Sequence, residues 1–117
     1  MLKPDPAVLY LRVEPGRAPG PAEDEARAFA DQRGLTVAEV VTDPYGEPDP
    51  GRRAGWQRVR DMAARGEIGT VVVRLPSCIA PDRSHEVRYR EMRWLLDRGV
   101  RVRFSWPALT LPDGGAA

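Results

Sequence analysis

Apolar residues in this chain fall into short continuous runs, separated by stretches in which they recur every three or four positions. Residues 7–13 are nearly all apolar and stop before Pro15-Gly16. A short apolar run bounded by turn residues is typical of a strand buried on both faces of a sheet. Two further runs, 35–42 and 68–75, have the same character, and a fourth begins at residue 100. The pattern therefore predicts four strands.

The stretches between these runs have the periodicity of amphipathic helices. Helices are predicted over residues 22–33, 53–65 and about 83–98. Each is followed by a glycine, which readily adopts the left-handed conformation found just after many helices: Gly34, Gly66 and Gly99. On the third helix the spacing predicts four residues that face the core: Val87, Met92, Leu95 and Leu96.

Strands and helices thus alternate along the whole chain, which predicts an α/β fold. Such alternation favours a single, mostly parallel sheet of four to five strands with helices on both faces and right-handed crossovers. We expect one domain over residues 7–106, with an N-terminal tail at 1–6 and a C-terminal tail at 107–117. Ligands of such folds bind beyond the carboxyl ends of the strands. Those ends carry Glu14, Asp43 and the loop 76–82.

The fourth strand differs from the others because its apolar residues alternate with arginines. Arg101 and Arg103 punctuate the run, which is typical of an edge strand with a basic outer side. Arg90, Arg93 and Trp94 lie on the preceding helix. Arginine and tryptophan are enriched at binding hot spots. These five residues are therefore the predicted contact surface for a partner.

The first strand carries Tyr10, Arg12 and Val13, and this stretch resembles the opening Tyr-x-Arg-Val-Ser of the serine recombinases, the resolvase/invertase family. Four later segments are similar to family motifs in the same order: Asp43 after the second strand, Arg53-Ala54-Gly55-Trp56, residues 71–75 and residues 99–104. The resemblance spans residues 7 to 105 and implies a resolvase-like domain.

The same comparison shows where the chain departs from the family pattern. Glu14 stands at the position of the serine that attacks DNA in the family. The acid and the two arginines expected after the third strand are replaced, in that order, by Pro76, Ser77 and Ala80. Phosphoryl transfer depends on positive charge around the transferred oxygens. The resemblance therefore implies a degenerate site, in which Arg12 and Arg53 are retained and the nucleophile is not.

Composition and charge limit which other classes of protein fit this chain. Cys78 is the only cysteine, so neither an internal disulfide nor a multi-cysteine zinc site can form, which fits a cytoplasmic protein. No apolar run reaches the length of a membrane helix, and no apolar signal region opens the chain. The formal net charge is +1, yet residues 1–50 carry 5 basic and 10 acidic side chains, whereas residues 51–117 carry 13 and 7. Simple solvation or a bias towards GC-rich codons would give the same asymmetry, and a partner surface in the second half is the other interpretation.

Two further kinds of chemistry, nucleophilic catalysis and metal binding, each have a simpler alternative. Ser77 or Cys78 could act as a nucleophile with His85, the only histidine, but a lone thiol more often packs as a small apolar group. Carboxylates at 14, 43 and 47 would suit Mg²⁺ or Ca²⁺. A simpler alternative is that Glu14 pairs with Arg12 or Arg53. We predict no metal and no cofactor.

Two functions remain from the sequence. The first is a catalytically inactive resolvase-like domain that serves as a protein-interaction or regulatory module, binding a protein partner or a second copy of itself. The alternative is a non-catalytic DNA-binding protein, associated with recombination, that uses the arginine-rich second half. Neither involves a membrane.

Overall fold

A computed structural model describes residues 5–107 of the chain. Four strands and three α-helices alternate in the predicted order: β1 Asp5–Val13, α1 Gly20–Gln32, β2 Leu35–Pro44, α2 Ala54–Ala64, β3 Thr70–Val73, α3 His85–Leu96 and β4 Arg101–Phe104. Short 3₁₀ helices at Pro50–Arg52, Pro76–Cys78 and Asp82–Ser84 lie in the loops before α2 and α3.

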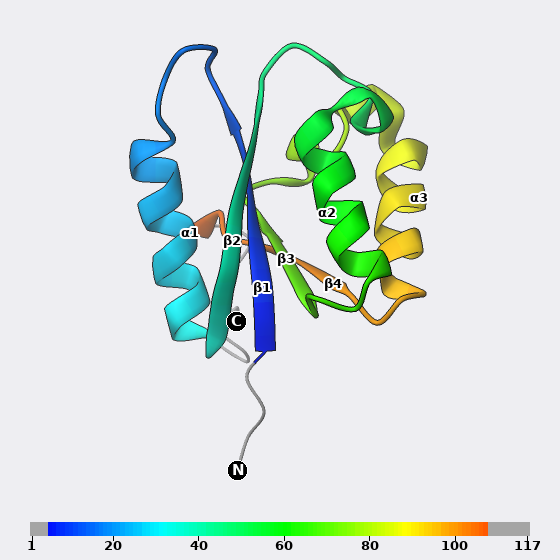
Figure 1. The fold of residues 1–117 in the computed structure, drawn as a ribbon. Coiled ribbons are helices and arrows are strands. Elements are labelled where there is room, and N and C mark those ends of the chain that lie inside the picture. Colours follow the sequence, from blue (N-terminus) through cyan, green and yellow to red (C-terminus); the bar gives the residue numbers. More distant parts are fainter. Residues whose placement is uncertain (1–4, 108–117) are drawn as a thin grey trace, which may run out of the picture.

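The four strands form one sheet in the order β2-β1-β3-β4, and every neighbouring pair is parallel. Helix α1 covers one face of the sheet, and α2 and α3 cover the other (Figure 1). The predicted α/β class is thereby confirmed, with four strands in the described part of the chain. Because the strands are parallel, the loops after β1, β2 and β3 meet at a single edge of the sheet.

Burial follows this layering. On the α1 side, Leu9, Leu11 and Phe29 belong to one buried cluster. On the opposite side, Tyr10 and Trp56 belong to a larger cluster, with their ring centroids 5.0 Å apart in an edge-on arrangement. Adjacent residues of β1 thus contribute to different cores, since successive side chains of a strand point to opposite faces. This explains why the first run is apolar at nearly every position.

Element boundaries differ modestly from the sequence pattern. Strand β1 begins at Asp5, inside the predicted N-terminal tail, and β3 is shorter than the apolar run that predicted it. The predicted C-terminal tail lies, from residue 108 onward, outside the described residues. Within residues 5–107, no helix is long and apolar enough to span a membrane.

One core prediction on the third helix is wrong. Leu96 was expected to face inward, but its side chain is 57% exposed. It lies beside β4, the last strand of the sheet, and in the described part of the chain no further strand extends the sheet past β4. The periodicity correctly assigned Leu96 to the apolar side of α3, but that side is wider than the sheet beneath it.

Candidate functional site

Glu14 lies in the loop after β1 and forms an ion pair with neither Arg12 nor Arg53. Its carboxylate forms an ion pair with Arg17, with Oε2 and Nε 3.2 Å apart, and both side chains are largely exposed. The expected pairing of Glu14 with Arg12 or Arg53 is therefore wrong. An exposed pair of this kind contributes little to stability, so Glu14 has no structural task that would explain its presence.

Arg12, in contrast, is almost wholly buried at the end of β1. Its Nη2 donates hydrogen bonds to the carbonyl oxygens of Pro44, at 2.9 Å, and Glu47, at 3.3 Å. The guanidinium also lies 5.5 Å from the centre of the Tyr45 ring, within cation–π range. Arg12 thus ties the end of β1 to the loop after β2.

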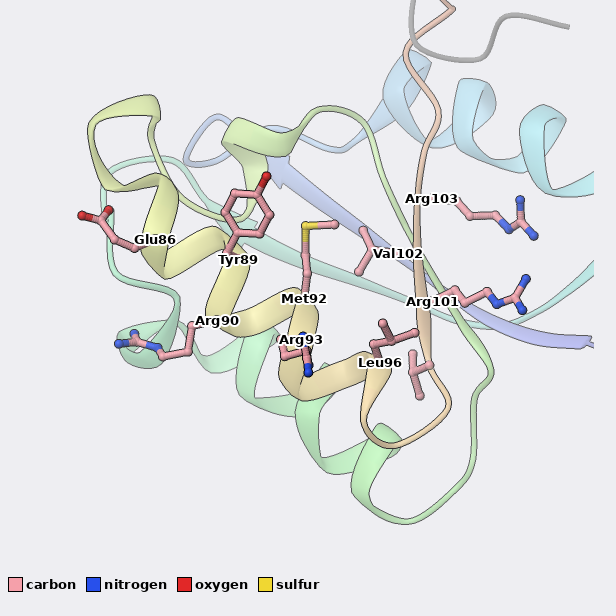
Figure 2. A pocket seen from close by; sticks show the side chains of 10 residues that line it. Glu86, Tyr89, Arg90, Met92, Arg93, Leu96, Arg101, Val102 and Arg103 are labelled. Atoms are coloured by element: carbon pink, nitrogen blue, oxygen red, sulfur yellow. The ribbon is translucent and has the colours of Figure 1, made fainter. Parts of the chain in front are cut away.

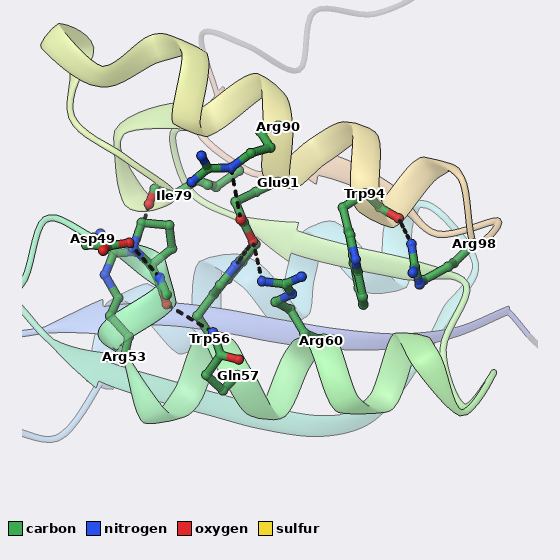
Figure 3. Close-up of polar contacts among 12 residues, drawn as sticks. Asp49, Arg53, Trp56, Gln57, Arg60, Ile79, Arg90, Glu91, Trp94 and Arg98 are labelled. Atoms are coloured by element: carbon green, nitrogen blue, oxygen red, sulfur yellow. Dashed lines mark hydrogen bonds and ion pairs between the residues drawn. The ribbon is translucent and has the colours of Figure 1, made fainter.

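Arg53 holds together two loops that are distant in the sequence. Its Nε donates to the carbonyl of Glu47 at 2.8 Å and its Nη2 to that of Pro48 at 3.1 Å. Its Nη1 reaches the carbonyls of Cys78 and Ile79, at 2.9 and 2.8 Å. The contact with Ile79 is visible in Figure 3. All three guanidinium nitrogens are therefore committed to backbone oxygens.

Asp43 at the end of β2 organises the start of α2. Its carboxylate accepts hydrogen bonds from the backbone amides of Gly55, at 2.8 Å, and Trp56, at 2.9 Å, which satisfies two unpaired donors of the first helical turn. It also accepts the hydroxyl of Tyr10 at 2.7 Å. Burial, reinforced by this hydrogen bond, raises the pKa of Tyr10 well above its ordinary value.

The closeness of Asp43 also explains the glycine at position 55. A Cβ atom on Gly55 would lie 2.6 Å from an oxygen of Asp43, closer than real contacts allow. The Arg-x-Gly pattern at residues 53–55 therefore has a structural reason here. Arg53 clamps two loops, and Gly55 gives the aspartate room to cap the helix.

The segment after β3 offers no assembled nucleophile. Ser77 is exposed in the 3₁₀ helix, Cys78 is buried in the larger core, and His85 is exposed at the start of α3. Ala80 is buried, and its carbonyl accepts a hydrogen bond from Nη2 of Arg88 at 2.7 Å. Pro76 opens the 3₁₀ helix. None of these residues supplies charge toward the ends of the strands.

The carboxylates considered for a cation are likewise committed elsewhere. Asp43 accepts three hydrogen bonds, Glu14 pairs with Arg17, and Glu47 accepts the amide of Asp49 at 3.2 Å. Among residues 5–107, no three histidine, cysteine, aspartate or glutamate side chains gather in a way that could hold a metal ion. The carboxyl edge of the sheet is thus a set of loop clamps and helix caps.

A hollow of the described structure lies elsewhere, between α3 and β4 (Figure 2). Its volume is about 790 Å³. Four of the predicted contact residues line it: Arg90, Arg93, Arg101 and Arg103. Arg90 and Arg93 come from α3, whereas the side chains of Arg101 and Arg103 extend from β4 away from that helix (Figure 2). We call this hollow the α3–β4 groove.

The apolar part of the groove was not predicted as a binding surface. Tyr89, Met92 and Leu96 line it from α3, and Val102 lines it from β4. Tyr89 is 71% exposed, which is unusual for a large aromatic side chain on a small domain. A signal was present in the sequence, since these three helix residues recur at intervals of three and four. Such spacing predicts an apolar stripe and does not say what covers it.

Trp94, the fifth predicted contact residue, lies on a different side of α3. Its ring is stacked between the guanidinium groups of Arg60 on α2 and Arg98, which lie 4.2 and 3.6 Å from the ring centre. Arg98 also donates from Nη1 to the carbonyl of Trp94 at 2.9 Å (Figure 3). The structure thus places Trp94 between two helices, away from the α3–β4 groove.

Glu91 is a buried charge that the sequence did not single out. Its Oε1 accepts the indole N–H of Trp56 at 2.7 Å, and the guanidinium groups of Arg60 and Arg90 lie 3.7 and 3.9 Å from its oxygens (Figure 3). A buried carboxylate requires such partners. No pattern in the sequence distinguished Glu91 from the exposed charges around it.

The geometry defines a class of protein: a small parallel α/β domain with a hollow at one edge of the sheet. No protein-family model matches the chain, and neither does any curated protein sequence. Solved structures do match. The catalytic domain of ISC1926 TnpA, an IS607-like serine recombinase, aligns with a TM-score of 0.70 at 16% identity, covering 86% of this chain and 70% of that one.

Two further structures agree with this match. The N-terminal catalytic domain of TP901-1 integrase gives a TM-score of 0.72 at 18% identity, over 86% of this chain and 77% of its own. The first ORF of transposon ISC1904 from Sulfolobus solfataricus P2 gives a TM-score of 0.61 at 15% identity, covering 94% of this chain and 74% of that one. The chain therefore has the resolvase-like fold of serine recombinase catalytic domains, as its motifs predicted.

Proposed function

We propose that this domain does not cleave DNA and acts by binding a protein partner through the α3–β4 groove. The identity and placement of Glu14 are the main support for the claim that the domain does not cleave DNA. It occupies the nucleophile position of the family motif, and its side chain turns into solvent toward Arg17. A carboxylate there repels a phosphodiester and cannot form the ester through which a serine would hold the DNA end.

The electrostatic part of the chemistry is missing as well. Arg12 and Arg53 are buried and bonded to carbonyl oxygens, so recruiting them to a phosphate would break the loops they hold. Pro76, Ser77 and Ala80 bring no compensating charge. Removing one preorganised donor typically costs about 3 kcal/mol of transition-state stabilisation. Losing several together with the nucleophile leaves no strand-cleaving mechanism of the family's kind.

A plasmid assay tests this part of the proposal. Supercoiled DNA incubated with the wild-type protein should stay unnicked, and no protein–DNA adduct should survive denaturation. Glu14→Ser should be equally inactive, because the surrounding charge is still absent, and Glu14→Ala serves as its control. Nicking or adduct formation by Glu14→Ser, but not by Glu14→Ala, would show that the site is intact apart from one residue.

The binding part of the proposal is supported by the make-up of the α3–β4 groove. Tyrosine, methionine and arginine are enriched at protein interfaces, and all three line this hollow. Leu96 and Tyr89 stay exposed although most other large apolar side chains of the described residues are covered. An exposed apolar strip bordered by arginines is the expected form of a protein-binding surface.

DNA binding without catalysis is the second candidate, and one observation favours it. Arg101 and Arg103 lie next to each other on an edge strand, and no acidic partner pairs with either among residues 5–107. Free arginines can contact phosphates. The apolar wall of the groove suits a nucleic acid backbone poorly, however, which places the protein partner first.

A further inference from the structure

Among residues 5–107, no strand covers the outer edge of β4, and its hydrogen-bonding groups are unused. On its inner side, the amides of Arg101 and Ser105 donate to the carbonyls of Gly69 and Val73, at 3.0 and 2.9 Å. Successive residues of a strand direct their amides to opposite sides, so the backbone groups of Val102 and Phe104 face away from β3. In the described part of the chain no strand pairs with that side. Such an edge is a template for another strand.

The two sides of this edge differ in chemistry. On the side of α3 lie Tyr89, Met92 and Leu96, while the arginines at positions 101 and 103 extend from the other side of β4 (Figure 2). A strand added beside β4 would direct alternate side chains to these two sides. One set would contact apolar groups and the other set would meet guanidinium groups.

The arginines of β4 still have bonding capacity. Neither Arg101 nor Arg103 forms an ion pair among residues 5–107, whereas Arg93 on α3 pairs with Asp97 at 3.3 Å. The Nε of Arg103 is buried and has no hydrogen-bond partner within that range. A buried donor without a partner is costly, and the positive charges of Arg101 and Arg103 are not neutralised by any acidic side chain of residues 5–107. The charge of the missing partner is therefore negative.

We propose that the α3–β4 groove binds an extended segment of a partner protein in which apolar and acidic residues alternate, and that this segment adds as a strand to β4. The proposal rests on the proposed function, because it names the partner chemistry of that surface. Apolar side chains of the segment lie against α3, acidic ones face Arg101 and Arg103, and the backbone bonds to Val102 and Phe104.

A second copy of this chain suits the edge poorly. Pairing β4 with β4 of another molecule would bring Arg101 and Arg103 of one copy near the same arginines of the other. Like charges directly opposite each other destabilise a strand pair. The strand order leaves β2 as the other open edge, and its polar surface side chain Glu39 is already held by Arg58 at 2.8 Å. A separate acidic segment remains the better occupant.

Two short labelled peptides test the proposal by fluorescence anisotropy on the full chain. One alternates valine with glutamate, and the other alternates valine with lysine. The wild-type protein should bind the glutamate peptide and not the lysine peptide. The double variant Arg101→Glu/Arg103→Glu should bind the glutamate peptide at least about tenfold more weakly, as expected when two attractions become repulsions. The same variant should gain affinity for the lysine peptide.

A matched control changes the same number of charges elsewhere. Arg52 and Arg65 are exposed and lie outside the groove. The variant Arg52→Glu/Arg65→Glu should bind the glutamate peptide as the wild type does. Hydrogen exchange adds a backbone readout, because bound peptide should slow exchange at the amides of Val102 and Phe104. A peptide that bound only through its charges would leave these amides unprotected.

Several results would overturn the proposal: no binding of the glutamate peptide, equal binding of both peptides, equal weakening by the control variant, or unchanged exchange at the two amides. Self-association of the wild type that disappears in Arg101→Glu/Arg103→Glu would identify a second copy as the occupant and would also refute it. These results are independent of the plasmid assay. If the protein neither nicks DNA nor binds the peptide, the proposal that it does not cleave DNA stands, and the proposal of strand addition at β4 is refuted.

Discussion

Asp43 shows how a residue suggested by family resemblance acquires a purely structural explanation. It caps α2 through two backbone amides and accepts the hydroxyl of Tyr10, so its carboxylate is fully engaged inside the protein. Tyr10 in turn is completely buried and lies edge-on to Trp56. The hydrogen bonds of Asp43 thus link both α2 and β1 to the end of β2. Retention of such a residue in the sequence is no sign of retained chemistry.

Tyr10 makes stability depend on pH in alkaline solution. Its pKa is raised in the native state, mainly because burial disfavours the phenolate, and its hydrogen bond to Asp43 adds to the shift. Above pH about 10 the unfolded chain therefore loses this proton while the native protein keeps it. The free energy of unfolding should then fall by up to about 1.4 kcal/mol per pH unit. Below the ordinary tyrosine pKa the contribution is fully present.

Urea denaturation between neutral pH and pH 11 checks this prediction. At neutral pH, Tyr10→Phe should be less stable than the wild type by about 1 kcal/mol, the usual net contribution of one hydrogen bond. That difference should shrink above pH about 10, because the variant has no proton to hold. Tyr89→Phe is the control, since Tyr89 is exposed. A constant difference across the whole range would contradict the assignment.

Some residue roles could be predicted from the sequence and others could not. The motif order identified Arg12, Asp43 and Arg53 as positions of the family's site, and the structure buries all three at the carboxyl edge of the sheet. The partners of these residues are mostly backbone carbonyls and amides, which look alike in any sequence. For that reason the pairing of Glu14 with Arg17, rather than with a buried arginine, became visible only in the structure.

At the scale of elements, α3 is a helix with three different surroundings. One side packs on the sheet through Leu95, a second meets α2 through Glu91 and Trp94, and a third leaves Tyr89 and Leu96 exposed in the groove. Periodicity predicted the helix and, except for Leu96, its inward side. It could not assign the other two sides, because charged and apolar residues alternate around the helix. The neighbours of a helix, rather than its own pattern, decide which side is buried.

Glu91 provides the test of the α2–α3 contact. In Glu91→Ala the indole N–H of Trp56 loses its acceptor in a buried position, which should cost about 2–3 kcal/mol of unfolding free energy. Glu91→Gln keeps a side-chain oxygen at that place and should cost less than half as much. Chemical denaturation followed by tryptophan fluorescence would measure both. Equal losses in the two variants would show that the charge on Glu91, rather than the acceptor, is what matters.

At the scale of the whole molecule, the parallel order and the three loops at one edge were predictable from alternation alone. The sheet's open edge at β4 was also foreseen, because Arg101 and Arg103 interrupt the apolar run. What could not be foreseen is that α3 extends past this strand and forms a hollow of about 790 Å³ with it. That hollow depends on the angle between a helix and a strand, which no local pattern specifies.

Charge at this scale also bears on DNA binding. The formal net charge is only +1, and many arginines of the described part are neutralised nearby. Five examples are the pairs Arg27–Glu23, Arg58–Glu39, Arg74–Glu25, Arg88–Asp82 and Arg93–Asp97. Arg12 and Arg53 are buried. Two of these pairs, Arg58–Glu39 and Arg74–Glu25, bring acidic residues of the first half to arginines of the second, so part of the positive excess of the second half is cancelled in space.

Because the formal net charge is low and several arginines are paired with carboxylates, we expect weak binding to duplex DNA. Each phosphate contact adds about 0.9 to the slope of log affinity against log salt, so contacts through Arg101 and Arg103 alone should give a slope no steeper than about −2. Fluorescence anisotropy with a labelled random duplex at low and physiological salt measures it, with Arg101→Ala/Arg103→Ala as the test variant. DNA and an acidic protein segment would bind the same two arginines. A steep salt dependence of DNA binding that Arg101→Ala/Arg103→Ala makes shallower would therefore favour DNA as the partner.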